Sequence, residues 1–343
     1  MSTGIFPKLS SSYILSFQFS SWYTIFANVS IKSTIIRPLS QEFRDYLDAD
    51  GVFIPEGSED VPTKSSIFDD GEGPDDISDE DETPEGQHFA FPDLDAKIRE
   101  SIQEYGAVFP KLNFSSPKDA SWILPASSPL KCTSPAEVYL LLKSSDFITH
   151  DTSPESAFSG CDLPETYDLE LVLRKWYPID RSRELRCFVR HNILIGISQR
   201  DTNYYDFYNE VNIRDTILAS ITAFWESKIR PKWEISDYTF DILLTRDLVR
   251  GHILDFNPYA PQTDALLFTY DELHDIFLER IAGDKKSATL KIIDSKTHPA
   301  AVSNMPAYQH NMMPFEALNI SNGRNIEEFS NAWKEGIRES MNG

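Results

Sequence analysis

The order of strand-forming and helix-forming segments between residues 168 and 258 most constrains the fold of this chain. LELVLRKWYP predicts a strand, and ELRCFVRHNILIGISQRD predicts a hairpin that turns near His191 and Asn192. IRDTILASITAFWESKI then predicts a helix, and DYTFDILLTRDLVRGHILDFNP predicts a second hairpin that turns between Asp247 and Gly251. This order is typical of an α+β fold with antiparallel strand pairs, and it differs from the alternating strand–helix series of a Rossmann fold.

Oxygen-bearing side chains interrupt the apolar strands of the second hairpin. In ILDFN, strand alternation places Leu254 and Phe256 on one face and Asp255 and Asn257 on the other. If this hairpin closes as predicted, Asp241 of the preceding strand lies beside them on the same face. Clustered carboxylates repel one another unless a cation or protons intervene. Two interpretations stay open: a solvent-facing strand end with an Asn-Pro turn, and a site for a hard cation such as Mg²⁺.

Charged residues in the neighbouring strands extend this pattern. In the first hairpin, Glu184 and Arg186 share one strand face, a spacing that an ordinary surface ion pair also produces. Four basic residues of the neighbouring strands would complement a polyphosphate: Lys111, Lys175, Arg186 and Arg200. The spacing is thus compatible both with a Mg²⁺–nucleotide site and with a set of surface ion pairs.

Further helices are predicted upstream of residue 168. FPDLDAKIRESIQEYGA predicts a helix that begins near Pro92 and ends at Gly106, and SPAEVYLLLKSS predicts a helix capped by Ser134. Between them, VFPKLNFSSPKDASWI predicts two short strands around a polar loop. Nearer the N-terminus, IKSTIIRPL predicts a strand and QEFRDYL a short helix.

Residues 56–86 form a strongly acidic segment. The whole chain of 343 residues has a net charge of −22, and this segment contains 13 acidic residues and one lysine, a net of −12. It has few large apolar side chains, so it cannot bury enough surface to offset the entropy lost on ordering. We expect a disordered insert that either keeps the chain soluble or binds a partner. The negative charge disfavours direct binding to nucleic acid or to an anionic membrane.

The uncharged stretch between Lys8 and Lys32 is long enough to span a bilayer. It is rich in serine and lacks both a basic leading region and a continuous apolar core, so we expect a partly buried segment of a soluble protein. The three cysteines lie at 132, 161 and 187, which is no metal-binding spacing, and their odd number argues against a disulfide framework. Reduced thiols and a cytoplasmic location follow as expectations.

Several long segments carry a family resemblance. VFPKLNFSSPKDASWI, LLLKSSDFITHD, ELVLRKWYPI, ELRCFVRHNILIGISQRD and ILDFNPYAPQTDALLFTYDEL occur in this order, with SSWYTIFANVSIKSTIIRPL before them. Together they resemble the cell division cycle protein 123 family, and the resemblance covers roughly residues 16 to 275. The acidic insert lies where that family also has one.

The resemblance implies an ATP-grasp-like α+β fold of two lobes with antiparallel sheets, in which ATP lies between the lobes. It implies an assembly chaperone that binds ATP and Mg²⁺, contacts the gamma subunit of translation initiation factor 2 and promotes formation of the heterotrimer. We expect a monomer. The expected domains are an N-terminal segment packed on the body (1–55), the insert (56–86), an N-terminal lobe (87–173), a C-terminal lobe with the metal site (174–283), and a tail with a short helix (284–343).

Site residues follow from the same resemblance. Lys111 resembles the lysine that contacts phosphate, and the loop after it stands where many ATP-grasp enzymes have a glycine-rich cover, although this loop has no glycine. The motif RKWY resembles the hinge between the lobes. The expected ATP-binding residues are Lys111, Asn113, Ser116, Lys118, Arg174, Lys175, Trp176, Tyr177, Glu184, Arg186, Arg200 and Asp241. The expected Mg²⁺ ligands are Asp255, Asn257 and Asp241.

Two other functions stay open. An ATP-grasp ligase would form an acyl-phosphate and transfer the acyl group to an amine, but the absence of glycine in residues 114–119 and of a recognisable carboxylate pocket counts against it. A scaffold that acts only through the acidic insert is the second alternative. The resemblance implies no covalent reaction, so we predict no catalytic residue.

Overall fold

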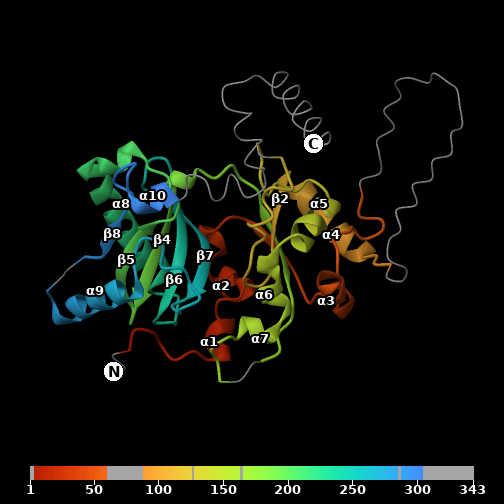
Figure 1. Cartoon of the computed structure of the whole chain (residues 1–343), viewed down its shortest axis with the longest axis horizontal. Helices are drawn as coiled ribbons and strands as arrows, with labels where there is room; N and C mark the ends of the chain where they lie inside the picture. The colour runs from red at the N-terminus through yellow and green to blue at the C-terminus, as the bar shows by residue number, and fades with distance from the viewer. Residues whose placement is uncertain (1–3, 60–87, 126, 163–164, 285–286, 304–343) are drawn as a thin grey trace, which may run out of the picture.

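The computed structural model describes residues 4–59, 88–125, 127–162, 165–284 and 287–303. Figure 1 shows two sheets side by side, each covered by helices, which confirms the α+β class. The helices are α1 (Ser11–Leu15), α2 (Phe19–Phe26), α3 (Gln41–Asp48), α4 (Pro92–Tyr105), α5 (Pro135–Lys143), α6 (Thr149–Thr152), α7 (Pro154–Ala157), α8 (Val211–Phe224), α9 (Tyr270–Ala282) and α10 (Pro299–Ser303). The strands are β1 (Ser33–Ile36), β2 (Val108–Lys111), β3 (Leu171–Lys175), β4 (Glu184–Arg190), β5 (Ile193–Gln199), β6 (Tyr238–Leu244), β7 (Gly251–Pro258) and β8 (Thr289–Lys291).

The two sheets differ in size and strand direction. The smaller sheet has the order β1-β3-β2 and is antiparallel throughout. The larger sheet has the order β7-β6-β4-β5-β8, in which β8 runs parallel to β5 and the other pairs are antiparallel. We call the two halves the N-lobe and the C-lobe. The chain crosses from one to the other between the end of β3 and the start of β4.

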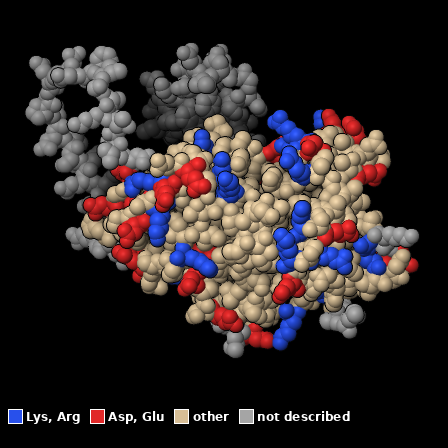
Figure 2. All heavy atoms as spheres, turned by 180° about the vertical axis from the view of Figure 1, so that it is seen from behind, with Lys and Arg blue, Asp and Glu red and all other residues tan. Residues whose placement is uncertain are grey.

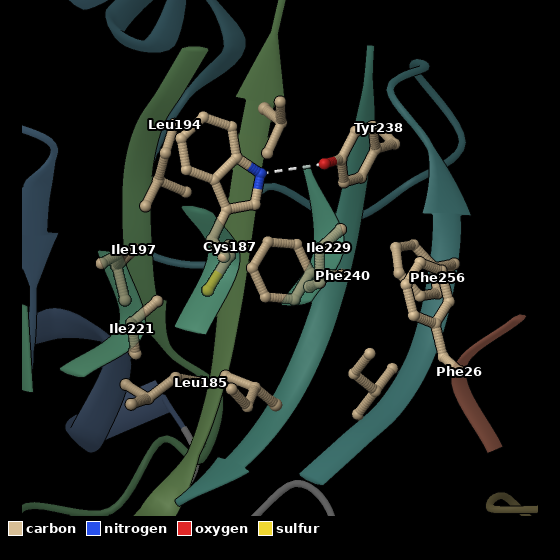
Figure 3. Close-up of a cluster of buried hydrophobic side chains, with 14 of the residues drawn as sticks. Phe26, Leu185, Cys187, Leu194, Ile197, Ile221, Ile229, Tyr238, Phe240 and Phe256 are labelled. Carbon is tan, nitrogen blue, oxygen red and sulfur yellow. Dashed lines mark hydrogen bonds between the residues drawn. The ribbon is translucent and has the colours of Figure 1, made fainter. Parts of the chain in front are cut away.

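Each lobe has its own hydrophobic core. In the C-lobe, one face of the larger sheet packs against α8 and α2, and Figure 3 shows part of this core. Phe26 of α2 stacks on Phe256 of β7 with 5.3 Å between ring centroids, and the Trp225 indole donates a hydrogen bond of 2.9 Å to the Tyr238 hydroxyl. On the opposite face, α9 covers Phe188 and its neighbours. Strand residues therefore point alternately into two apolar layers.

The N-terminal segment ties the lobes together. The backbone N–H of Phe19 donates to the carbonyl of Asn113 in the N-lobe at 2.8 Å. The buried carboxylate of Glu170 accepts from the backbone N–H of Ser20 at 2.9 Å, while the side chains of α2 pack into the core of the C-lobe. Burial raises the pKa of Glu170, and its hydrogen bonds from Ser20 and Gln18 partly offset that effect.

The structure confirms the main predicted elements. The first hairpin turns at His191 and Asn192, which have positive φ angles of 49° and 57° and so suit a two-residue turn. Gly106 ends α4 with a φ of 80°, a conformation that glycine adopts without strain. Ser134 caps α5 and accepts from the N–H of Glu137. Within the described residues, no helix combines the length and apolar character that a membrane crossing requires.

Five expectations differ from the observed elements or lie outside the described residues. The second strand expected in VFPKLNFSSPKDASWI is a series of turns, in which Ala120 and Leu124 are buried without strand pairing. The lobe boundary at 173/174 falls inside β3, and the tail expected from 284 contributes β8 to the larger sheet. Residues 60–86 of the acidic insert and the predicted C-terminal helix lie outside the described residues.

Candidate functional site

Asp255 and Asn257 lie on the face of β7 that alternation predicts. Asp255 pairs with Asp241 across the β6–β7 ladder, and Asn257 pairs with Thr239. The register shifts between Asp241 and Ile242, so β7 contains a bulge one residue before Asp255. The two carboxylates are therefore direct cross-strand neighbours, which brings the three predicted oxygen ligands together.

Two arginines already engage Asp241. Arg186 of β4 donates two hydrogen bonds to its carboxylate, at 2.8 and 2.9 Å, in a bidentate pair. The Nε atom of Arg200 lies 3.2 Å from the second oxygen. Burial would raise the pKa of Asp241, but the two guanidinium groups and Lys118 outweigh burial and hold the pKa well below its usual range. Asp241 thus orders the arginines, and a metal would have to share its oxygens with them.

Lys111 connects the two sheets at the same place. Its side chain is 1% exposed, and its Nζ atom lies 3.1 Å from the Oδ2 atom of Asp255. The same ammonium also donates to the carbonyl oxygen of Phe114. Lys111 ends β2 in the N-lobe and Asp255 lies in β7 of the C-lobe, so this ion pair spans the junction of the lobes.

Arg174 is the least satisfied cation of the site. It is 7% exposed, and its Nε and Nη2 atoms have no hydrogen-bond partner among the described residues. Burial lowers its pKa, while the nearby carboxylates of Asp255 and Glu184 act in the opposite direction. A buried guanidinium with free N–H groups beside carboxylates is an arrangement that an additional anion, such as a phosphate, would satisfy.

Lys118 brings a further charge to this junction. Its side chain is accessible to solvent, yet the surrounding protein desolvates its ammonium, and together with Arg200 this lowers the pKa of Lys118 to about 7. Glu184, Asp241 and Asp255 lie close enough to act in the opposite direction. An anion that entered here would favour the protonated amine.

Glu184 and the predicted residues of the connection between the lobes have different surroundings. Glu184 pairs with Arg200 at 3.3 Å and lies at the start of β4. In the connection between the lobes, the Lys175 ammonium lies 5.4 Å from the Tyr177 ring centroid, and the Trp176 indole donates to the carbonyl of Pro129. Tyr177 is 46% exposed, so its ring is available to a ligand.

Asn113 and Ser116 have contrasting surroundings. Asn113 is fully buried, where its amide donates to the carbonyl of Asp168 at 2.8 Å and its side-chain oxygen accepts from the N–H of Glu170 at 2.9 Å. Its side chain thus holds the N-lobe together, and a ligand contact there stays a prediction. Ser116 is half-buried in the loop between Lys111 and Lys118.

Sequence reasoning missed one residue beside this loop. Asp151 is fully buried and accepts hydrogen bonds from the backbone N–H groups of Phe114 and Ser115 at 2.7 and 3.0 Å. It belongs to FITHD in a segment that carries the family resemblance. Asp151 lies in the short polar helix α6, and nothing in its spacing relates it to residues 114 and 115.

The donor set fits a magnesium ion only together with a ligand. In the described parts of the chain, no three His, Cys, Asp or Glu side chains are grouped so that they could hold a metal. Asp255, Asn257 and Asp241 offer two carboxylates and one amide, and one carboxylate is shared with arginines. Mg²⁺ commonly takes one or two protein carboxylates and completes its octahedron with water and phosphate oxygens.

Comparison with known proteins shows which family the chain belongs to. The family model described as D123 matches residues 22–321. The chain belongs to the D123 family. A member from Schizosaccharomyces pombe, named translation initiation factor eIF2 assembly protein, is 34% identical over 337 residues, covering 95% of this chain and 97% of the relative. A Xenopus laevis protein of the same name is 42% identical over 267 residues, 76% of this chain and 77% of that protein.

A solved structure of this D123 family supports the same assignment. The structure of Cdc123 from Schizosaccharomyces pombe aligns with a TM-score of 0.66 and 32% identity, covering 84% of this chain and all of that one. A Yarrowia lipolytica relative named cell division cycle protein 123 is 37% identical over 260 residues, 76% of this chain and 67% of that protein. The resemblance to the cell division cycle protein 123 family is therefore confirmed.

Proposed function

We propose that this D123 protein is an assembly chaperone for translation initiation factor 2 that binds ATP and Mg²⁺ between its two lobes and contacts the gamma subunit of the factor. Relatives named eIF2 assembly protein cover most of this chain, which supports the assembly role. An ATP-grasp-like arrangement, with the nucleotide at the junction of the N-lobe and the C-lobe, accounts for the charges gathered there.

The observation that carries the nucleotide proposal is the buried guanidinium of Arg174, whose Nε and Nη2 atoms have no hydrogen-bond partner among the described residues, in a junction with excess positive charge. The cations are Lys111, Lys118, Arg174, Arg186 and Arg200, and the acids are Glu184, Asp241, Asp255 and Asp264. Five cations less four acids leave +1 when Lys118 is protonated, in a chain whose net charge is −22. The Mg²⁺ complex of ATP has two negative charges, so the positive charge of this junction favours its binding.

The residues then have distinct proposed roles. Lys111, Lys118 and Arg174 would bind phosphate oxygens, and Asp255 with Asn257 would hold Mg²⁺ under them. When bound, the metal would neutralise phosphate charge. Because Arg186 and Arg200 are fixed by Asp241, they would approach the phosphates in a defined orientation. The exposed ring of Tyr177 would lie beside the adenine.

We propose that the nucleotide acts by fixing the angle between the lobes. ATP can shift the arrangement of the lobes only by as much as its affinity differs between the arrangements. Contacts from both sheets to one ligand provide that difference, since Lys111 belongs to the N-lobe and Asp255 to the C-lobe. The fixed arrangement would present one docking surface to the gamma subunit.

Co-purification tests this proposal. The isolated gamma subunit is captured on wild type and on Asp255→Ala, with and without Mg²⁺–ATP, alongside Asp275→Ala, which removes an exposed carboxylate on α9. We expect ATP to increase capture by wild type and by Asp275→Ala, but not by Asp255→Ala. If Asp255→Ala loses ATP binding and still assembles the factor normally, the coupling is wrong. Steady ADP production with the factor subunits would point to the ligase instead.

A further inference from the structure

A buried aspartate holds the loop that follows Lys111. The Oδ2 atom of Asp151 accepts from the backbone N–H groups of Phe114 and Ser115, and its Oδ1 atom accepts from the Ser115 hydroxyl at 2.7 Å. The Nδ1 atom of His150 lies 3.0 Å from Oδ1. Asp151 has no exposed surface. Four contacts to one buried carboxylate make this the main polar anchor at the start of the loop.

Aromatic packing also holds the start of this loop in place. The ring of Phe114 meets the rings of His150 and Tyr167 edge-on, with centroid distances of 6.0 and 5.8 Å. The Tyr167 hydroxyl donates to the carbonyl of Asp151 at 2.6 Å, and Arg44 donates to the carbonyl of Tyr167. The anchor therefore connects to the body of the N-lobe, so the loop start cannot move without breaking both hydrogen bonds and ring contacts.

The anchor extends to the junction of the lobes through one carbonyl group. The carbonyl oxygen of Phe114 accepts from the ammonium of Lys111, which also pairs with Asp255 at 3.1 Å. Because Asp151 fixes the N–H of Ser115, which shares a planar peptide group with the carbonyl of Phe114, it also sets where that carbonyl lies. A displacement of this loop would therefore move the ammonium of Lys111 relative to Asp255.

We propose that Asp151 is a positioning residue for the nucleotide site, a role that rests on the proposed ATP-binding function. It holds Phe114 and Ser115 in one place before any ligand arrives. It also occupies the first two backbone N–H groups, so these cannot form an amide cradle around phosphate. Phosphate recognition then depends on side chains, chiefly Lys111 and Lys118. A fixed loop of this kind binds a nucleotide but does not close over it as a glycine-rich cover does.

Hydrogen exchange on the wild-type protein tests the fixed loop directly. We expect the amides of Phe114 and Ser115 to be protected without nucleotide and to change little when Mg²⁺–ATP is added. The amide of Ser116 donates no hydrogen bond among the described residues, so it should exchange fast and serve as an internal reference. Fast exchange at Phe114 and Ser115 that slows only with nucleotide would show a mobile cover and overturn the proposal.

Substitution tests the positioning of Lys111. Asp151→Asn places an N–H donor where the backbone already donates, so we expect affinity for Mg²⁺–ATP to fall by at least about tenfold while affinity for adenosine is unchanged. Asp95→Asn is the matched control, because Asp95 is a buried carboxylate of the N-lobe that binds the Tyr139 hydroxyl and does not contact the loop. It should change stability without changing the ratio of the two affinities.

The outcomes separate this proposal from the proposed function. Equal loss of ATP and adenosine binding in Asp151→Asn would show a purely structural role and overturn the positioning. If Asp151→Asn does not fold, Ser115→Ala replaces it as the variant, because it removes the hydroxyl contact to Asp151 and keeps both backbone contacts. The hydrogen exchange of Phe114 and Ser115 in the wild-type protein then decides alone. If wild type binds no ATP, the nucleotide site is wrong, while exchange at Phe114 and Ser115 still reports whether Asp151 holds the loop.

Discussion

Lys111 and Asp255 are 144 residues apart in the chain and 3.1 Å apart at the junction of the lobes. One ends β2 of the smaller sheet, and the other lies in the edge strand β7 of the larger sheet. The lysine is almost completely buried, whereas the side chain of Asp255 is 21% exposed. Solvent therefore reaches the carboxylate from one side, so a metal cation could replace the ammonium of Lys111 as its partner.

A double-mutant cycle should show that this pair couples the lobes. Because one partner is buried, we expect Lys111→Met and Asp255→Asn to have a coupling free energy of about 1–2 kcal/mol in unfolding by urea. The exposed pair of Lys8 and Asp162, at 3.0 Å, is the matched control and should show no measurable coupling. Additive effects at the junction would contradict the idea that the pair contributes to the contact between the lobes.

Asp241→Asn should destabilise the fold more than the small change in side-chain size suggests. It leaves the buried guanidinium of Arg186 without its anion, and such a loss typically costs about 3–5 kcal/mol. The depressed pKa of Asp241 sets the pH dependence, since a carboxylate with a lowered pKa stabilises the fold above its unfolded value and loses this contribution as pH falls through the folded value.

The unfolding free energies of wild type and Asp241→Asn, measured from pH 7 down to about pH 3, check this pH dependence. The difference between the two proteins should stay constant from about pH 7 to pH 5 and shrink only below about pH 4. A difference that disappears already between pH 7 and 5 would show that a group other than Asp241 carries the effect.

The sequence predicted the C-lobe part of the site better than the N-lobe part. Strand alternation places Asp255 and Asn257 on one face, and hairpin pairing brings Asp241 to them, because both relations are local. The bulge in β7 lies before Asp255 and leaves the relation between Asp255 and Asn257 unchanged. Local periodicity is thus sufficient where two adjacent strands supply the residues.

Contacts across the chain could not be predicted in the same way. Arg174 has the sequence context of an edge-strand charge, but β3 is the central strand of its sheet and Phe19 packs beside the guanidinium, so it is buried. The strand β8 has three residues and pairs in parallel with β5, too short for a periodic signal. These features depend on which distant segments meet, and no pattern within a single segment encodes that.

Gly196 lies where β5 closely approaches α9. A Cβ atom there would lie 2.8 Å from the Cδ2 atom of Leu273 and 3.2 Å from the ring of Phe268. Leu273 belongs to α9 and its side chain is fully buried, so a shift away from the new Cβ atom would disturb its packing. We expect Gly196→Ala to cost about 1–3 kcal/mol in unfolding free energy. Adding Leu273→Ala should recover part of this cost, and strictly additive losses would contradict a clash between these two residues.

Proton uptake should accompany ATP binding through Lys118. With a pKa of about 7, this amine is mostly neutral at pH 8, whereas a nearby triphosphate favours its protonated form. At pH 8 the phosphates have already lost their protons, since their last pKa is about 6. Binding should therefore take up close to one proton, measured by calorimetry in buffers of different ionisation enthalpy.

Lys118→Arg is the control variant, because arginine keeps its charge over this pH range. It should take up no proton and bind Mg²⁺–ATP with equal affinity from pH 7 to 9, while the affinity of the wild-type protein falls. Equal uptake by both proteins would assign the proton to another group.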